Sequence, residues 1–256
     1  MNLTPEQWAM GAAAGTLIGF SKTGMPGVGI LVVPMLAHAF GGRASVGLML
    51  PMLIFGDVFA VAWYRHHARW DRIGRLLPWV AVGMGAGAWL LYVLGEQHAH
   101  KDQMNVIIGW LVLAMLGVHL ARLRWGEQLT PHSRVGAAAV GTGAGFTTTA
   151  SNAAGPIMAL YMQSMGFRKQ EFMGTTAWYF LIVNVAKLPV FYLLSLATPD
   201  RPLITGASLL VDLAMLPVIV AGALTGKWFL PRVRQSAFDG LVLVLSGIAA
   251  LQLALG

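Results

Sequence analysis

Six apolar stretches constrain this chain more than any other feature, because each is long enough to cross a lipid bilayer as a helix. A transmembrane helix needs about 17–25 predominantly apolar residues. The stretches comprise residues 44–64, 74–94, 104–121, 172–195, 205–229 and 238–255. Charged residues make up only 11% of the 256 residues, whereas a soluble domain carries about 25%. We therefore expect an all-α integral membrane protein, folded as a single polytopic domain over residues 1–256.

Two further apolar regions, residues 6–40 and 135–166, are interrupted by residues 19–27 and 147–156, respectively. Each arm beside a break has about 12–15 residues, which make about 18–22 Å of helix. That length is shorter than the hydrocarbon core of a bilayer, about 30 Å. The pattern favours two re-entrant helical hairpins, and the alternative is two tilted full crossings in each region. Both arrangements return the chain to the side from which it came.

Basic residues concentrate in alternate connecting segments. Twelve of the 17 lysine and arginine residues lie in residues 65–75, 122–134, 168–171 and 227–239. The positive-inside rule predicts that these segments are cytoplasmic and that both termini lie on the external side. The net charge of +7 is then mainly a topology signal, and we expect no nucleic-acid partner. Glu6 precedes the first apolar region and no basic segment does, so we expect no cleavable signal peptide.

The two halves of the chain share a pattern of glycine, proline and aromatic residues in the same order. Gly15-x3-Gly19-Phe20 matches Gly141-x3-Gly145-Phe146, and Leu77-Pro78-x4-Gly83-x3-Gly87-x-Trp89 matches Leu216-Pro217-x4-Gly222-x3-Gly226-x-Trp228. Gly47 precedes Asp57 by ten residues, as Gly174 precedes Asn184. Glycines four residues apart also let membrane helices pack closely.

This pattern predicts an internal repeat. We place repeat one at residues 5–122 and repeat two at residues 135–256, joined by the basic cytoplasmic loop 122–134. Each repeat would be a broken or re-entrant helical hairpin followed by three transmembrane helices. Three crossings are an odd number, so the second repeat would enter the membrane from the opposite side. Inverted repeats of this kind are common among secondary transporters.

The two breaks hold most of the polar side chains within the apolar regions. They are Ser21, Lys22 and Thr23 in the first break, and Thr147, Thr148, Thr149, Ser151 and Asn152 in the second. Helix N-termini near the midplane attract anions, and hydroxyl, amide and ammonium groups donate hydrogen bonds to oxyanions. We therefore expect a substrate-binding site for an anion between the breaks. The alternative is that the hydroxyl groups only cap the broken helices, and the two roles are compatible.

Four ionisable residues fall within apolar segments: Lys22, Asp57, Lys187 and Asp212. Burial of charge in a membrane is expensive, so such residues are candidates for function, although they could also pair inertly. We add Lys187 and Asn184 to the expected substrate-binding residues and take Asp57 and Asp212 as candidates for proton coupling. Asn184 corresponds to Asp57 in the repeat, so a neutral amide would face a protonatable carboxyl group.

Motifs for other chemistry are missing from the sequence. There is no cysteine and no Gly-Lys-Ser/Thr phosphate loop, and no catalytic triad or metal-ligand cluster stands out. We therefore expect neither an enzyme nor a cofactor or metal. Two alternatives to a carrier are a passive anion channel and, with less support, an intramembrane lipid-modifying enzyme.

The chain resembles the sulfite exporter TauE/SafE family of membrane permeases along nearly its whole length. The resemblance lies in residues 152–161, 169–178 and 184–189, and in Leu50-Pro51, Gly56-Asp57 and Tyr64-Arg65. It implies a proton-linked secondary carrier of sulfite, thiosulfate, sulfoacetate or another organosulfonate in the bacterial inner membrane. The expected partners are that anion, protons and the lipid bilayer. The direction of transport and a homodimeric assembly stay open.

Overall fold

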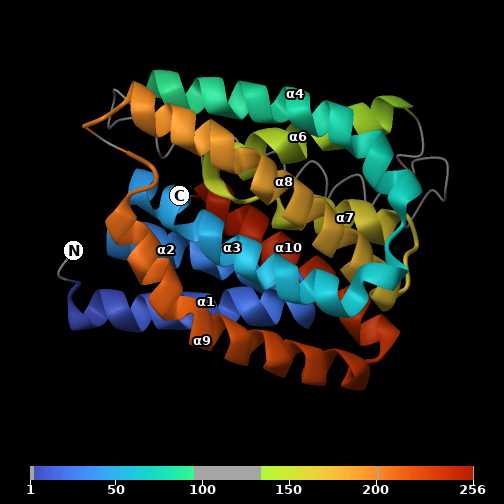
Figure 1. Cartoon of the computed structure of the whole chain (residues 1–256). Helices are drawn as coiled ribbons and strands as arrows, with labels where there is room; N and C mark the ends of the chain where they lie inside the picture. The colour runs from blue at the N-terminus through green and yellow to red at the C-terminus, as the bar shows by residue number, and fades with distance from the viewer. Residues whose placement is uncertain (1–2, 95–133, 201, 256) are drawn as a thin grey trace.

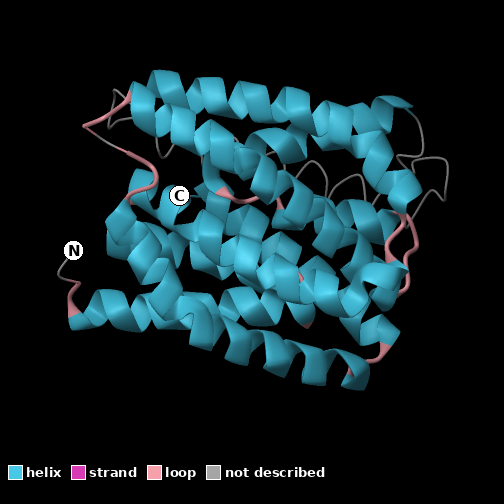
Figure 2. Ribbon diagram, in the orientation of Figure 1, coloured by secondary structure: helices cyan, strands magenta, loops and turns pink. Residues whose placement is uncertain are grey.

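Long helices form where the sequence is continuously apolar, and every regular element of the described chain is a helix (Figures 1 and 2). The computed structural model describes residues 3–94, 134–200 and 202–255. Its long helices are α3 (Gly42–Tyr64), α4 (Trp70–Leu94), α8 (Lys169–Ala197), α9 (Gly206–Phe229) and α10 (Gln235–Leu255). The expected span 104–121 and most of the loop 122–134 lie outside the described residues.

Four described helical stretches are long and apolar enough to cross a membrane. They are Ala44–His67, Trp70–Val93, Lys169–Ala197 and Gly206–Arg232. The described part of the chain is therefore all-helical and has helices that suit a membrane, as expected. Helix α8 begins three residues before the expected segment because Glu171, in its first turn, accepts a hydrogen bond from the backbone N–H of Arg168 at 3.3 Å. This satisfies one of the donors that a helix N-terminus leaves unpaired.

The two broken regions form helix pairs of unequal length, so the expectation of arms of similar length is wrong. In the first region α1 (Pro5–Thr23) has 19 residues, and α2 (Val32–Phe40) has nine after the short 3-10 helix η1 (Val28–Leu31). In the second, α6 (Arg134–Ser151) has 18 residues and α7 (Gly155–Ser164) has ten. The polar residues of each break up to Thr23 and Ser151 continue the first helix, and Asn152 lies just beyond its end.

The stop signals differ between the breaks. After α1, Pro26 lacks a backbone N–H and Gly27 has a φ of 101°, a left-handed conformation that glycine adopts readily. After α6, Asn152 has a φ of 58° and Pro156 lies in the first turn of α7. Figure 1 places α2 near the end of the molecule where α1 begins, and α7 near the opposite end, where α6 begins.

The helices pack in pairs that bring the two halves of the chain together. Helix α1 lies along α9, α4 lies along α6, and α3 packs against α8, as the lower and upper layers of Figure 1 show. The repeat glycines lie at these contacts. A Cβ atom on Gly19 would come within 3.0 Å of the α9 backbone, and one on Gly83 would come equally close to the α6 backbone. Small residues therefore allow the close approach of backbones that packing in lipid uses.

A pair of alanine substitutions on α4 tests this packing. Gly83→Ala should lower thermal stability in detergent, because the new methyl group meets the carbonyl oxygen of Thr142 and overpacking costs about 1–3 kcal/mol. Gly85→Ala is the matched control, since no atom outside the backbone of its own helix lies within 4 Å of its Cβ position and alanine favours a helix by up to about 1 kcal/mol. Equal melting temperatures for the two variants would contradict the packing.

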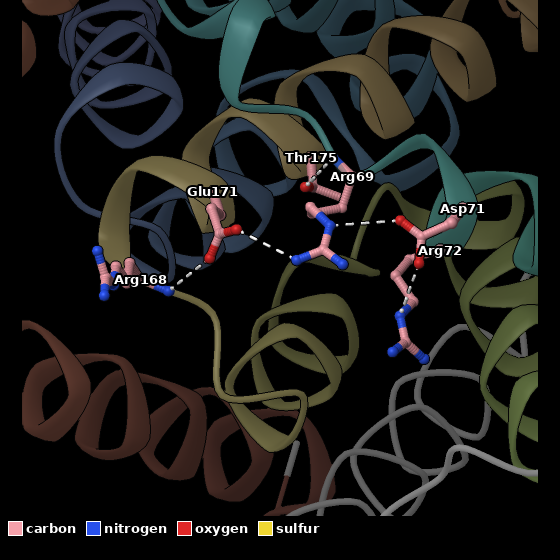
Figure 3. Close-up of polar contacts among 6 residues, drawn as sticks. All are labelled: Arg69, Asp71, Arg72, Arg168, Glu171 and Thr175. Atoms are coloured by element: carbon pink, nitrogen blue, oxygen red, sulfur yellow. Dashed lines mark hydrogen bonds and ion pairs between the residues drawn. The ribbon is translucent and has the colours of Figure 1, made fainter.

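On the side of the basic loops, polar contacts join the α3–α4 connection to the start of α8 (Figure 3). The guanidinium group of Arg69 lies 3.2 Å from Glu171 and 3.4 Å from Asp71, and its backbone N–H donates to the hydroxyl of Thr175 at 2.9 Å. The hydrogen bond to Glu171, with the charge of Asp71, raises the pKa of Arg69. Exposed pairs of this kind contribute less than about 1 kcal/mol, so they position the loop more than they stabilise the fold.

Candidate functional site

A cavity lies where the two breaks approach each other between α3 and α8. Including the space where it opens, it encloses about 750 Å³. Its wall contains residues of both breaks, among them Ser21, Lys22, Gly27, Thr148, Asn152 and Gly155. Apolar side chains of α3 and α8 form much of the remainder, among them Met49, Leu53, Phe172 and Phe180. The cavity therefore combines a few polar groups with an apolar lining, as small-molecule sites usually do.

At the first break, Lys22 forms a buried ion pair with α3. Its Nζ lies 2.7 Å from Oδ1 of Asp57 and 4.3 Å from the ring centroid of Phe180 on α8. The Nδ2 of Asn184 donates to Oδ2 of Asp57 at 2.6 Å. The side chain of Lys22 is 12% exposed while that of Asp57 is fully buried. Lys22 and Asn184 line the cavity and Asp57 lies behind them.

At the second break, Lys187 is bound to backbone and side-chain oxygens. Its Nζ donates to the carbonyl oxygen and the hydroxyl of Thr148, both at 3.1 Å, and to Oδ1 of Asn152 at 2.6 Å. Lys187 is fully buried and is not among the residues that line the cavity. Its ammonium lies at the C-terminus of α6, where the helix leaves carbonyl groups unpaired and favours a positive charge.

The contact with Lys187 also fixes the side-chain amide of Asn152. An ammonium group can only donate and a carbonyl oxygen can only accept, so Oδ1 faces Lys187 and Nδ2 faces the carbonyl oxygen of Val46, at 3.0 Å. Among the described residues, Asn152 is the only one besides glycine with a positive φ. The amide of Asn152 thus lies in the cavity wall with its orientation determined at both ends.

Most of the predicted hydroxyl groups cap the broken helices. Thr23 donates to the carbonyl oxygens of Gly19 and Ala223, at 3.1 and 2.7 Å. Three more hydroxyl groups donate to carbonyl oxygens of their own helix, and they belong to Thr147, Thr149 and Ser151. Ser21 lines the cavity and accepts a hydrogen bond from the backbone N–H of Gly29 at 3.1 Å. Of the predicted substrate-binding residues, the structure brings Ser21, Lys22, Thr148, Asn152 and Asn184 into the cavity wall.

Asp212 lies apart from this group. It is 1% exposed on α9, next to Val211 of the apolar cluster that joins α1, α2, α3 and α9. Neither carboxylate oxygen has a hydrogen-bond partner among the described residues, and Asp212 is not among the residues of the cavity wall.

Two contacts of this site were not expected from the sequence. Phe180 packs against the ammonium of Lys22, and Tyr64 donates to the carbonyl oxygen of Thr23 at 2.8 Å. Phe180 precedes Asn184 by four residues, so helical spacing could have placed both on one face of α8. Tyr64 carries no such signal, because it lies 41 residues from Thr23.

Spanning helices, two breaks and a central cavity with a buried ion pair define a polytopic membrane transporter. Comparison with known protein families agrees: the family described as sulfite exporter TauE/SafE matches residues 11–253. The chain belongs to this family, and at the family level it is a membrane permease for sulfur anions. The search of curated proteins and the search of solved structures gave no match.

Proposed function

We propose that the chain is a proton-coupled secondary carrier for small sulfur-containing anions, with sulfite, thiosulfate, sulfoacetate and related organosulfonates as candidates. The observation that carries the proposal is the ammonium of Lys22 in the cavity wall, balanced by a carboxylate that lies behind it. An anion that enters the cavity meets this positive charge first. The start of α7 at Gly155 supplies further donors beside it, as does the second N–H of the Asn152 amide, whose first N–H is bonded to Val46.

An inverted repeat is supported by the way the helices pair, because the repeat relates one packed pair of helices to another. If repeat one corresponds to repeat two, then α1 corresponds to α6 and α4 to α9. The contact of α1 with α9 is then equivalent to that of α6 with α4, and both are present. Asp57 and Asn184 hold corresponding positions and contact each other, as residues beside a two-fold axis do. The unequal arms, which return α2 and α7 to opposite ends of the molecule, fit re-entrant hairpins.

The proposed location is a bacterial inner membrane, with the basic loops in the cytoplasm and both termini outside. Because the chain has no cysteine, single cysteines report topology without background. In intact cells, a membrane-impermeant maleimide should label Asp200→Cys, in the α8–α9 connection. His66→Cys, in the basic segment 65–75, should react only after permeabilisation. The reverse pattern would invert the proposed orientation.

Proton coupling is proposed to involve Asp57, because an anion at Lys22 competes with that carboxylate for the same ammonium. Protonation of Asp57 removes the competitor and keeps the net charge of the site constant. Asp212 is a second candidate, supported by its buried carboxylate without a hydrogen-bond partner among the described residues. Its separation from the cavity wall makes it a candidate for proton movement and not for anion contact.

Transport in proteoliposomes tests the proposal. The wild type should accumulate radiolabelled sulfite against its gradient only when a pH gradient is imposed. Asp57→Asn should lose this uphill accumulation, at least about tenfold, and retain exchange of internal for external sulfite, because an amide cannot release a proton. Uphill transport that survives in Asp57→Asn would exclude this residue from coupling. Flux in the wild type that only follows the sulfite gradient would instead indicate an anion channel.

A further inference from the structure

The two asparagine amides in the cavity wall are held differently. Both amide ends of Asn152 are occupied, by Lys187 and by the carbonyl oxygen of Val46. Asn184 is held at one end only. Its Nδ2 donates to Asp57, and its Oδ1 is buried with no hydrogen-bond partner among the described residues. A buried polar atom without a hydrogen-bond partner destabilises a protein by about 1–3 kcal/mol. The unpaired Oδ1 of Asn184 therefore needs an explanation.

We infer that Asn184 is an anion-binding residue whose amide orientation follows the protonation state of Asp57. Ionised Asp57 can only accept hydrogen bonds, so it holds the Nδ2 of Asn184 and leaves the acceptor Oδ1 on the other side of the amide. Protonated Asp57 has an O–H that donates to Oδ1. The amide then turns by about 180° and presents its NH2 group, a donor, on the side of the cavity. This inference rests on the proposed proton-coupled transport. It connects proton uptake by Asp57 to the hydrogen-bond donors that the cavity offers the anion.

The charged residues around Asp57 are consistent with a connection between its protonation and anion binding. Lys22 from α1 lies 2.7 Å from its carboxylate, and Lys187 from α8 is a more distant positive charge. Helix α9 also packs on α3 and carries Asp212, which makes no ion pair among the described residues. When Asp57 takes up a proton from water in the cavity, Lys22 loses its partner and becomes available to the anion. One proton uptake therefore supplies two groups for the anion, the ammonium of Lys22 and the amide NH2 of Asn184.

This arrangement predicts how anion affinity depends on pH. The anion-bound form holds one more proton than the empty form, so affinity falls as pH rises, by up to about tenfold per pH unit while Asp57 titrates. Methanesulfonate is a suitable probe, because its sulfonate stays ionised and does not itself contribute to the pH dependence. Its dissociation constant can be measured by calorimetry on the full-length protein in nanodiscs.

Three variants separate the contribution of the Asn184 amide to anion binding from the contribution of the proton on Asp57. Asn184→Leu keeps the side-chain volume but has no amide, so it should weaken binding about tenfold at low pH and leave binding at high pH unchanged. The affinity change between low and high pH is then about tenfold smaller than in the wild type, and the remainder comes from the release of Lys22 by protonated Asp57. Asp57→Asn places a permanent donor beside Oδ1 of Asn184, so it should bind methanesulfonate tightly at every pH. Combining both substitutions should lose that gain. Thr176→Val is the control, because it removes a hydroxyl of the same cavity wall and should retain the pH dependence of the wild type.

The outcomes are distinct. A pH dependence in Asn184→Leu equal to that of the wild type overturns the amide switch while leaving the proposed carrier intact. Failure of wild-type protein to bind any sulfonate or sulfite overturns the proposed function itself. If Asn184→Leu does not fold, infrared difference spectroscopy of the wild type and Asp57→Asn decides. Addition of methanesulfonate should produce the infrared band of a protonated carboxyl group in the wild type and no such band in Asp57→Asn. The inference is contradicted if the band also appears in Asp57→Asn, or if it appears in neither protein.

Discussion

Replacing Lys22 by alanine should reduce anion affinity at least about 100-fold. A charge-assisted hydrogen bond contributes about 1.5–3 kcal/mol, which corresponds to roughly ten- to hundredfold in a dissociation constant. The loss is larger here because Asp57, left without its partner 2.7 Å away, repels the anion. Binding of sulfite and methanesulfonate to purified protein measures the effect.

Folding must be separated from binding in this experiment. Removing one member of a buried ion pair destabilises a protein by about 3–5 kcal/mol, so Lys22→Ala alone could fail to fold. The double variant Lys22→Ala/Asp57→Asn removes both charges and should recover stability without recovering affinity. Lys227→Ala, at an exposed lysine that packs on the ring of Trp63, is the control and should bind normally. A stable double variant with wild-type affinity would show that the anion site lies elsewhere.

Replacing Lys187 by methionine should destabilise the protein strongly. The substitution leaves the carbonyl oxygen and hydroxyl of Thr148 and the Oδ1 of Asn152 without their donor. Each buried acceptor that loses its partner costs about 1–3 kcal/mol, so the loss of all three donors should cost about 3–9 kcal/mol. Thermal unfolding in detergent, followed by fluorescence-detected size exclusion, measures the loss.

The same substitution distinguishes a structural lysine from a ligand. Adding anion should stabilise Lys187→Met by as many degrees as it stabilises the wild type, because the ammonium lies behind the cavity wall and not in it. Lys227→Met is the matched control for loss of a lysine charge. Normal stability combined with loss of anion-induced stabilisation would instead identify Lys187 as a direct ligand.

The membrane class and the helix positions could be predicted because they depend on local properties. Hydropathy and length identify spanning helices without knowledge of their neighbours. Helices α3, α4, α8 and α9 accordingly begin and end close to the bounds of the apolar stretches. The lengths of the arms in the broken regions could not be predicted in this way. Polar residues such as Ser21 and Thr147 resemble a loop in sequence, yet they continue α1 and α6. The hydroxyl of Thr147 donates to the backbone of its own helix, and the hydroxyl of Ser21 accepts from the backbone of the segment that follows α1.

Four ionisable residues within apolar segments can be identified from local composition alone, because charged residues are rare in such segments. The surroundings of these residues depend on how the helices pack. Lys22 and Lys187 are equivalent in hydropathy, but one borders the cavity beside Asp57 and the other is enclosed at the end of α6. Asp57 has two partners and Asp212 has no hydrogen-bond partner among the described residues. Contacts between residues 35 to 127 positions apart set these differences, and no local pattern encodes them.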